Sequence, residues 1–261
     1  MSFPIDFNAD AVISLAQEAG KKILGIYAQD FEVYEKVDES LLTEADLLSH
    51  QTIIKGLGQI TPELPVLSEE SYKDEISNRL SWETYWLIDP LDGTKEFVKR
   101  NGEFTVNIAL VHKHEPVFGV VHAPVLEVTY WGGKNLGAHK IQNNKTNVIN
   151  IRKRPSDTAE WKIVGSRSHQ SDEFNAFVEK YPDAEIISMG SSLKLCLVAE
   201  GAADLYPRLG LTSEWDTAAS QAVVEAAGGY VLRMPEMTSL RCNENKSSLL
   251  NPHFLVCGDT L

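Results

Sequence analysis

The segment Asp89-Pro90-Leu91-Asp92-Gly93-Thr94 places two carboxylates beside a proline and a glycine. Proline and glycine favour a turn, which would aim Asp89 and Asp92 into one space. Carboxylates held so close repel each other unless a cation lies between them, and the intervening Leu91 carbonyl is a further oxygen ligand for a hard divalent ion. The segment also has the composition of an ordinary surface turn. Its spacing alone therefore leaves a cation site and a plain turn as alternatives.

Two further acidic segments lie elsewhere in the chain. Glu69-Glu70 follows the apolar residues Val66-Leu67, and Glu214-Trp215-Asp216-Thr217 stands at the start of an Ala-rich helical pattern. Taken singly, Asp216 is explained as a helix N-cap, and Glu69-Glu70 as a solvated loop. Each segment alone gives no reason to prefer a chemical role.

Together and in this order, the acidic segments resemble the inositol monophosphatase superfamily, whose members are metal-dependent, lithium-sensitive phosphatases. The resemblance rests on Glu69-Glu70, Asp89 to Thr94 and Trp215-Asp216-Thr217-Ala218-Ala219, and its motifs span Thr43 to Gly229. The stretches Lys95-Glu96-Phe97 and Arg100 to Asn107 are similar to the 3'(2'),5'-bisphosphate nucleotidase branch of the bacterial CysQ type. Inositol monophosphatases usually have a different stretch there.

The resemblance implies a set of metal ligands and a set of substrate contacts around the same acids. The implied ligands of Mg²⁺, as two or more ions, are Glu69, Asp89, the Leu91 carbonyl, Asp92 and Asp216. Four carboxylates give a charge of about −4, which about two divalent ions cancel before an anionic phosphate arrives. The implied substrate contacts in these segments are Glu69, Leu91, Asp92, Gly93, Thr94 and Asp216.

Thr43 and Asp46 open the second predicted helix at the spacing of a capping box. Similar family members use an aspartate at the position of Asp46, together with the hydroxyl at Thr94, to activate the attacking water. We therefore expect Asp46 and Thr94 to be catalytic. The capping role remains open beside this one, because the two roles can use different atoms of the same carboxylate.

Substrate specificity is expected in the second half of the chain. Gly165-Ser166-Arg167-Ser168-His169 and Gly190-Ser191-Ser192-Leu193-Lys194 each follow a predicted strand, and Arg208 follows a third. Loops at strand ends are where α/β folds bind ligands. Ser191, Ser192, Lys194 and Arg208 are the predicted substrate contacts. Plain surface loops are the alternative for Arg167, His169 and Arg208.

Hydrophobic spacing predicts the elements that position these residues. Helices are expected over Asp6 to Tyr27 and Thr43 to Leu57, a strand over Trp82 to Asp89, and an antiparallel meander over Phe104 to Val111, Val117 to His122 and Glu127 to Trp131. After Pro155, strands and helices alternate, with helices over Ser171 to Tyr181, Ser191 to Glu200 and Asp216 to Ala227. We expect an α/β protein with an α+β half over residues 1–155 and an α/β half over residues 156–261. The resemblance implies that both halves join in a layered α-β-α-β-α sandwich, with the active site between them.

Composition limits the possible partners. The 261 residues include 24 Lys and Arg against 37 Asp and Glu, a net charge of −13, which disfavours nucleic acid as a partner. Cys196, Cys242 and Cys257 have no metal-ligand spacing, and no apolar run is long enough for an integral membrane segment. We expect a cytoplasmic protein without a signal peptide. The sequence leaves peripheral association with the inner membrane and the oligomeric state open.

These observations predict a Mg²⁺-dependent phosphatase acting on a small nucleotide. The expected reaction removes the 3'-phosphate of adenosine 3',5'-bisphosphate to give AMP and phosphate. By family analogy, 3'-phosphoadenosine 5'-phosphosulfate is a second substrate, and the enzyme is linked to sulfate assimilation. The alternatives are an inositol monophosphatase with the same metal ligands and a catalytically silent regulator that binds metal or nucleotide.

Overall fold

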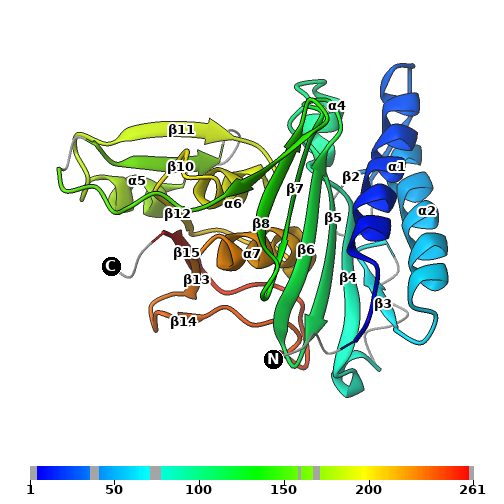
Figure 1. The fold of residues 1–261 in the computed structure, drawn as a ribbon. Coiled ribbons are helices and arrows are strands. Elements are labelled where there is room, and N and C mark those ends of the chain that lie inside the picture. The colour runs from blue at the N-terminus through cyan, green and yellow to red at the C-terminus, as the bar shows by residue number, and fades with distance from the viewer. Residues whose placement is uncertain (1–4, 36–40, 71–77, 158–159, 167–170, 259–261) are drawn as a thin grey trace.

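The chain folds into five layers in the order helix, sheet, helix, sheet, helix, as the computed structural model shows (Figure 1). The structure describes residues 5–35, 41–70, 78–157, 160–166 and 171–258. The predicted α/β class and the α-β-α-β-α order of layers are confirmed. The acidic cluster described below lies where the second and third layers meet.

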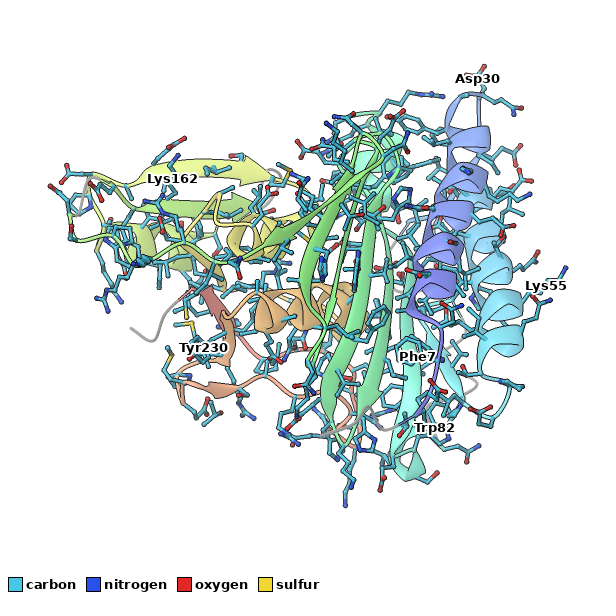
Figure 2. The ribbon with its side chains drawn as sticks, in the orientation of Figure 1. Phe7, Asp30, Lys55, Trp82, Lys162 and Tyr230 are labelled. Carbon is cyan, nitrogen blue, oxygen red and sulfur yellow. The ribbon has the colours of Figure 1, made fainter. Side chains whose placement is uncertain are left out.

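Two helices, α1 (Ala9–Tyr27) and α2 (Glu44–Ile60), form the first layer and lie side by side on the larger sheet (Figure 1). Both helices were predicted, but α1 begins later than expected because the Asn8 side chain accepts a hydrogen bond from Ala11 N at 3.2 Å and caps it. Under these helices, the ring of Phe7, labelled in Figure 2, lies 5.0 Å from that of Phe118. The two helices therefore cover an apolar face of the sheet.

The larger sheet has seven strands, and the predicted meander is its central part. Its strands, in spatial order, are β3 (Val66–Ser68), β4 (Thr84–Asp92), β5 (Thr105–His112), β6 (Glu115–Ala123), β7 (Val128–Gly133), β8 (Gly137–Gln142) and β9 (Lys145–Ile149). β3 is parallel to β4, and each later pair is antiparallel. The expectation that the strand ends at Asp89 was wrong, because β4 continues through Pro90 to Asp92 with an irregular register between Asp89 and Asp92.

The remaining short elements of the first half flank this sheet. The ribbon of β1 (Val33–Glu35) and β2 (Leu41–Thr43) precedes α2, a 3-10 turn (Arg79–Ser81) precedes β4, and α4 (Thr94–Val98) follows it. Gly93 joins β4 to α4 with φ +92°, a conformation that favours glycine. This turn brings Thr94 back toward the end of β4.

The smaller sheet has six strands and is built from the second half of the chain. Its spatial order is β11 (Glu185–Met189), β10 (Lys162–Ser166), β12 (Leu205–Arg208), β15 (Phe254–Cys257), β13 (Tyr230–Arg233) and β14 (Thr238–Ser239). β10 is parallel to both β11 and β12, whereas β15 is antiparallel to β12 and β13. The outer face of this sheet is covered by α5 (Asp172–Val178). The alternation of strands and helices predicted after Pro155 is thus confirmed.

The middle layer consists of α6 (Leu193–Ala199) and α7 (Glu214–Ala226), which pack between the two sheets (Figure 1). α7 crosses β6 so closely that a Cβ added at Gly119 would lie 2.1 Å from the Ala219 carbonyl oxygen. α6 is shorter than the predicted Ser191 to Glu200. α7 begins at Glu214 rather than at Asp216, because Ser213 is its N-cap. The first turn of α7 points at the end of β4.

The chain passes from the larger to the smaller sheet between β9 and β10, on either side of residue 155. One hydrophobic core nevertheless includes side chains from both sides of that point, such as Val121 and Val256. The division into residues 1–155 and 156–261 stays a prediction. Among the described residues, no helix has both the length and the apolar character needed to cross a bilayer.

Candidate active site

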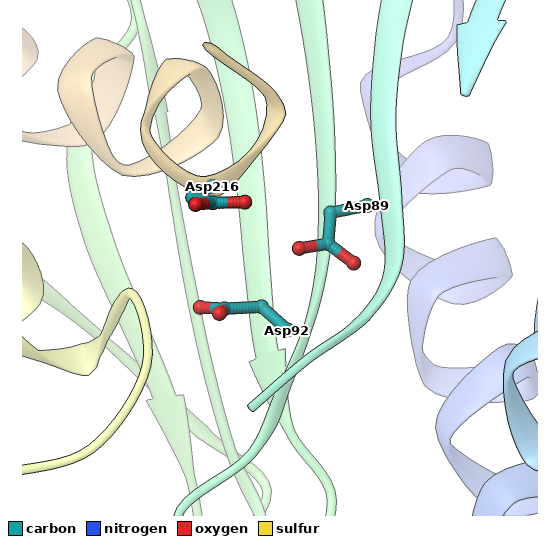
Figure 3. A group of neighbouring side chains, drawn as sticks. All are labelled: Asp89, Asp92 and Asp216. Carbon is teal, nitrogen blue, oxygen red and sulfur yellow. The ribbon is translucent and has the colours of Figure 1, made fainter. Parts of the chain in front are cut away.

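Three aspartates converge where α7 meets the end of β4. Asp89 and Asp92 come from β4 and Asp216 from the first turn of α7, and each offers one carboxylate oxygen within 4.8 Å of the other two (Figure 3). The family resemblance predicts that these three residues bind metal ions together. The structure brings them together in space.

Burial makes this cluster electrostatically unfavourable without a cation. Burial and the neighbouring charges of Glu69, Asp92 and Asp216 raise the pKa of Asp89 well above its ordinary value. Burial also raises the pKa of Asp216 well above its ordinary value, and the charges of Asp92 and Glu69 add to this effect. Oxygen ligands that repel one another in a buried space fit a hard divalent ion, which removes the repulsion when it binds.

Glu69 and Leu91, the other two predicted ligands, lie next to this cluster. β3 runs parallel to β4 with Ser68 opposite Ile88, and Glu69 N donates to the Ile88 carbonyl at 3.2 Å. Glu69 therefore stands beside Asp89. It is half-buried, so the simple solvated loop considered from the sequence does not describe it. Leu91 N donates to Asp89 Oδ1 at 3.0 Å, which fixes the orientation of that carboxylate.

Asp46 is buried at the start of α2 and makes both of the contacts considered from the sequence. Its Oδ2 accepts hydrogen bonds from Thr43 N at 2.7 Å and Thr43 Oγ1 at 2.6 Å, so the capping box is present. Its Oδ1 accepts a longer hydrogen bond from Thr94 Oγ1 at 3.4 Å. The Thr94 hydroxyl also lies 3.4 Å from the Leu91 carbonyl oxygen. The capping contact and the Thr94 contact therefore use different oxygens of Asp46.

The protonation of Asp46 suits an exchange of protons near neutral pH. Burial raises the pKa of Asp46 to about 7, although the two hydrogen bonds from Thr43 act in the opposite direction. A general base works best when its pKa lies near the working pH. The position and protonation of Asp46 thus match the chemistry expected of it, while its catalytic role stays a prediction.

A pocket of about 140 Å³ opens beside the cluster and contains most of the predicted substrate contacts. The predicted residues that line it are Asp92, Gly93, Ser191, Ser192, Lys194, Arg208 and Asp216. Glu69, Leu91 and Thr94 lie outside its lining. Arg167 and His169 fall outside the described residues, and of their loop Ser166 lines the pocket.

The pocket has positive charge at Lys194 and Arg208. Lys194 is buried, and burial lowers its pKa to about 8 although the charge of Asp92 opposes the change. Its Nζ lies 5.8 Å from the centre of the Tyr206 ring. Arg208 donates from Nη2 to the Leu211 carbonyl at 2.6 Å, and its buried Nε has no hydrogen-bond partner within the described part of the chain. The pocket is thus lined by two cationic side chains, which favour an anionic ligand.

Tyr206 is a pocket residue that sequence reasoning missed. It belongs to β12, two residues before Arg208, so both side chains leave the strand on the same face. The alternation of side chains along a strand could therefore have identified Tyr206 from the position of Arg208. Glu96, Thr212 and Thr217 also line the pocket, and no spacing in the sequence singled them out as substrate contacts.

Comparison with known proteins identifies the family. The inositol monophosphatase family model matches residues 7–254. A 3'(2'),5'-bisphosphate nucleotidase CysQ of Salmonella typhimurium is 45% identical over 249 residues, covering 95% of this chain and 98% of that protein. The CysQ of Escherichia coli (strain K12) is 46% identical over 225 residues, covering 85% and 89%.

A solved structure agrees with these sequence matches. The crystal structure of CysQ from Bacteroides thetaiotaomicron, a bacterial member of the inositol monophosphatase family, has a TM-score of 0.85 and 41% identity to this chain. The match covers 97% of this chain and 98% of that one. The chain therefore belongs to the inositol monophosphatase family of metal-dependent phosphatases, in the branch of the CysQ-type 3'(2'),5'-bisphosphate nucleotidases.

Proposed function

We propose that this enzyme uses Mg²⁺ to remove the 3'-phosphate of adenosine 3',5'-bisphosphate, giving AMP and inorganic phosphate. The observation that supports it best is the pocket, which is lined both by the acids Asp92 and Asp216 and by the cations Lys194 and Arg208. A bisphosphate needs a metal-bearing site for one phosphate and a positive site for the other. The names of the CysQ relatives support a nucleotide as the molecule that joins the two phosphates.

The acidic cluster would hold Mg²⁺ through Asp89, Asp92 and Asp216, with Glu69 and the Leu91 carbonyl as further ligands. Mg²⁺ bound there would neutralise the phosphate and lower the pKa of a water molecule. The mutual repulsion of the buried carboxylates supports this assignment, because it disappears only when they are protonated or bind a cation.

Residues of the chain would accept the proton and orient the attacking water. Asp46, with a pKa of about 7, accepts a proton from the attacking water, and the Thr94 hydroxyl, held between Asp46 and the Leu91 carbonyl, orients that water. The water oxygen forms a bond to the 3'-phosphorus in line with the breaking bond to the ribose 3'-oxygen. The ribose oxygen takes a proton from solvent as it leaves, and Asp46 returns its proton to solvent, so one water is consumed and one phosphate is released.

Lys194 and Arg208 would hold the 5'-phosphate, and Gly93 and Ser191 would contact the substrate between the two phosphates. A charge-assisted hydrogen bond to an anion is worth about 1.5–3 kcal/mol, so two such donors distinguish a bisphosphate from a monophosphate. The same positive site would accept the 5'-phosphosulfate of 3'-phosphoadenosine 5'-phosphosulfate. We include this molecule as a second substrate, and with it a link to sulfate assimilation. Cys196, Cys242 and Cys257 are buried and form no disulfide among the described residues, which is in keeping with a reducing, cytoplasmic location.

Phosphate release tests this proposal directly. The enzyme should release phosphate from adenosine 3',5'-bisphosphate with Mg²⁺ and lose this activity in EDTA, whereas a silent regulator would release none in either buffer. Rates on adenosine 3',5'-bisphosphate and inositol 1-phosphate should be compared at equal concentration. A faster rate on inositol 1-phosphate would contradict the proposed substrate.

A further inference from the structure

Three buried polar side chains form a closed ring of hydrogen bonds behind the acidic cluster. They are Thr105 and Asn107 of β5 and Ser192 at the start of α6, and none is more than 2% exposed. Thr105 Oγ1 lies 2.8 Å from Ser192 Oγ, Ser192 Oγ lies 2.8 Å from Asn107 Oδ1, and Asn107 Nδ2 lies 3.2 Å from Thr105 Oγ1. We call this set the Thr105–Ser192–Asn107 ring.

The direction of each bond in the ring follows from the number of protons available. Ser192 has one hydroxyl proton and donates it to Asn107 Oδ1, so it must accept from Thr105. Thr105 in turn accepts from Asn107 Nδ2. Each member donates once and accepts once within the ring. Replacing Thr105 therefore removes a partner of both Ser192 Oγ and Asn107 Nδ2, together with the longer contacts of the Thr105 hydroxyl to Ser191 Oγ at 3.2 Å and to Asp92 Oδ2 at 3.5 Å.

The ring is placed by strand register and holds one of the predicted metal ligands. Asp89 pairs with Asn107 and Asp92 with Thr105 across β4 and β5, so the two polar side chains stand beside the two acids. Ser192, fixed by its hydroxyl, donates its backbone N–H to Asp92 Oδ2 at 2.6 Å. One oxygen of Asp92 is thus held in place by the residue that the ring orients.

The same loop leads directly to Lys194. Ser192 is the N-cap of α6, and Lys194 lies in the first turn of that helix, where it faces the pocket. The loop is also held before Ser192, because Gly190 N donates to Glu103 Oε2 at 2.8 Å, and a Cβ added at Gly190 would lie 2.9 Å from the Glu103 carbonyl oxygen. The position of Lys194 relative to Asp92 therefore depends on the contacts of this loop with β5 and with Glu103, which precedes β5.

We propose that the Thr105–Ser192–Asn107 ring is a positioning device that orients Asp92 for metal binding and sets the separation between the metal cluster and Lys194. Thr105 and Asn107 are not part of the pocket lining, so they act through Asp92 and Ser192 rather than by touching the substrate. The orientation of Asp92 by the ring depends only on residues of the chain. The part that concerns Lys194 rests on the proposed function, in which Lys194 holds the second phosphate.

The test compares Thr105→Val with Thr105→Ser. Valine has the shape of threonine but no hydroxyl, whereas serine keeps the hydroxyl. Mg²⁺ affinity is measured by titration calorimetry on the substrate-free protein, and KM is measured for adenosine 3',5'-bisphosphate and for adenosine 3'-monophosphate. Thr105→Val should weaken Mg²⁺ binding about tenfold or more, as loss of a residue that orients a metal ligand does. It should also raise KM more for the bisphosphate than for the monophosphate, and Thr105→Ser should restore both values.

Two further variants keep the test decisive. Thr129→Val removes a buried hydroxyl from β7, where Thr129 bonds to His122 rather than to the site, and should change thermal stability without changing Mg²⁺ affinity. Ser192→Ala deletes one oxygen of the ring, keeps the backbone bond to Asp92, and should weaken Mg²⁺ binding in the same direction as Thr105→Val. Should Thr105→Val fail to fold, Ser192→Ala gives the answer by the same titration.

The results distinguish the positioning role of the ring from the proposed function. Mg²⁺ affinity within twofold of the wild type in folded Thr105→Val, or equal weakening in Thr105→Ser, would overturn the positioning role. A wild-type enzyme that binds Mg²⁺ but does not hydrolyse adenosine 3',5'-bisphosphate would contradict the proposed function, and the calorimetric comparison would still decide the role of the ring. Weakened Mg²⁺ binding with equal rises of both KM values would retain the metal part and reject the effect on Lys194.

Discussion

Asp216 accepts the backbone N–H of Ser213 through Oδ2 at 2.9 Å, and this bond closes the capping box that begins α7. Asp46 makes the same contact with Thr43 at the start of α2. In both aspartates the helix start fixes one carboxylate oxygen and so orients the side chain toward the site. Local backbone chemistry thus places two acids whose partners lie far away in the sequence.

Replacing Asp89 by asparagine should abolish turnover while retaining the fold. The substitution keeps the size of the side chain but removes one of the repelling charges, so the metal-free protein should unfold at a higher temperature than the wild type. Turnover should fall by far more than tenfold, which corresponds to about 1.4 kcal/mol of barrier. Thermal unfolding with and without Mg²⁺, together with steady-state kinetics, measures both effects. A soluble variant with turnover within tenfold of the wild type would rule out an essential role in metal binding.

Lithium should inhibit the enzyme at concentrations where sodium has no effect. A small monovalent cation that replaces one Mg²⁺ supplies less charge to the leaving oxygen or to the product phosphate. Initial rates are compared in lithium chloride and sodium chloride at equal ionic strength. Equal inhibition by the two salts would indicate simple screening of charge and would remove lithium sensitivity from this account.

Lys194→Met should raise KM for adenosine 3',5'-bisphosphate about tenfold or more, because one charge-assisted contact to the second phosphate is lost. The methionine keeps most of the volume that packs near Tyr206. KM for adenosine 3'-monophosphate, which lacks the second phosphate, should stay nearly constant. The exposed Lys55 on α2 (Figure 2) provides the control, because Lys55→Met changes the net charge equally and should leave both KM values unchanged. Equal effects of Lys194→Met on both substrates would mean that the lysine serves the sugar or the fold.

His122 should make folding stability depend on pH. Burial lowers its pKa to about 4, and its ring nitrogen Nδ1 lies 2.9 Å from Thr129 Oγ1. Unfolded histidine titrates near 6.5, so between these values the unfolded state binds more protons than the folded state. Its contribution is therefore complete above about pH 6.5 and falls as the pH drops toward 4.

Between pH 7.5 and pH 5, His122 should account for a loss of about 2 kcal/mol in the free energy of unfolding. Denaturant titrations of the wild type and His122→Gln at both pH values measure this difference. The variant should lose less stability than the wild type on acidification. The same loss in both proteins would assign the pH dependence to other groups.

The fold was largely predictable because each layer has a local pattern. The spacing of Val12, Ala16, Ala19 and Ile23 indicates a helix with one apolar face, and that face is buried. The end of β4 was not predictable in the same way. Pro90 suggested that the strand stops, but the proline is accommodated at an irregular pairing between Asp89 and Asp92.

The site was predictable where its chemistry depends on residues close in sequence or on family motifs, as for Asp89 and Asp92. The ring formed by Thr105, Asn107 and Ser192 could not be predicted, because it requires the loop after β11 to meet β5 of the other sheet. Asp216 illustrates the ambiguity that remains. An acid that caps a helix and an acid that belongs to the site have the same sequence pattern. Asp216 does both, because it accepts the Ser213 N–H and also belongs to the acidic cluster.

The identity of the nucleotide product tests the central claim most directly. Phosphorus NMR of the reaction with adenosine 3',5'-bisphosphate and Mg²⁺ distinguishes loss of the 3'-phosphate from loss of the 5'-phosphate. Binding of the 5'-phosphate near Lys194 leaves the 3'-phosphate at the acidic cluster, so the account predicts adenosine 5'-monophosphate and inorganic phosphate as the products. Formation of adenosine 3'-monophosphate, or no reaction under conditions where inositol 1-phosphate is hydrolysed, would contradict it.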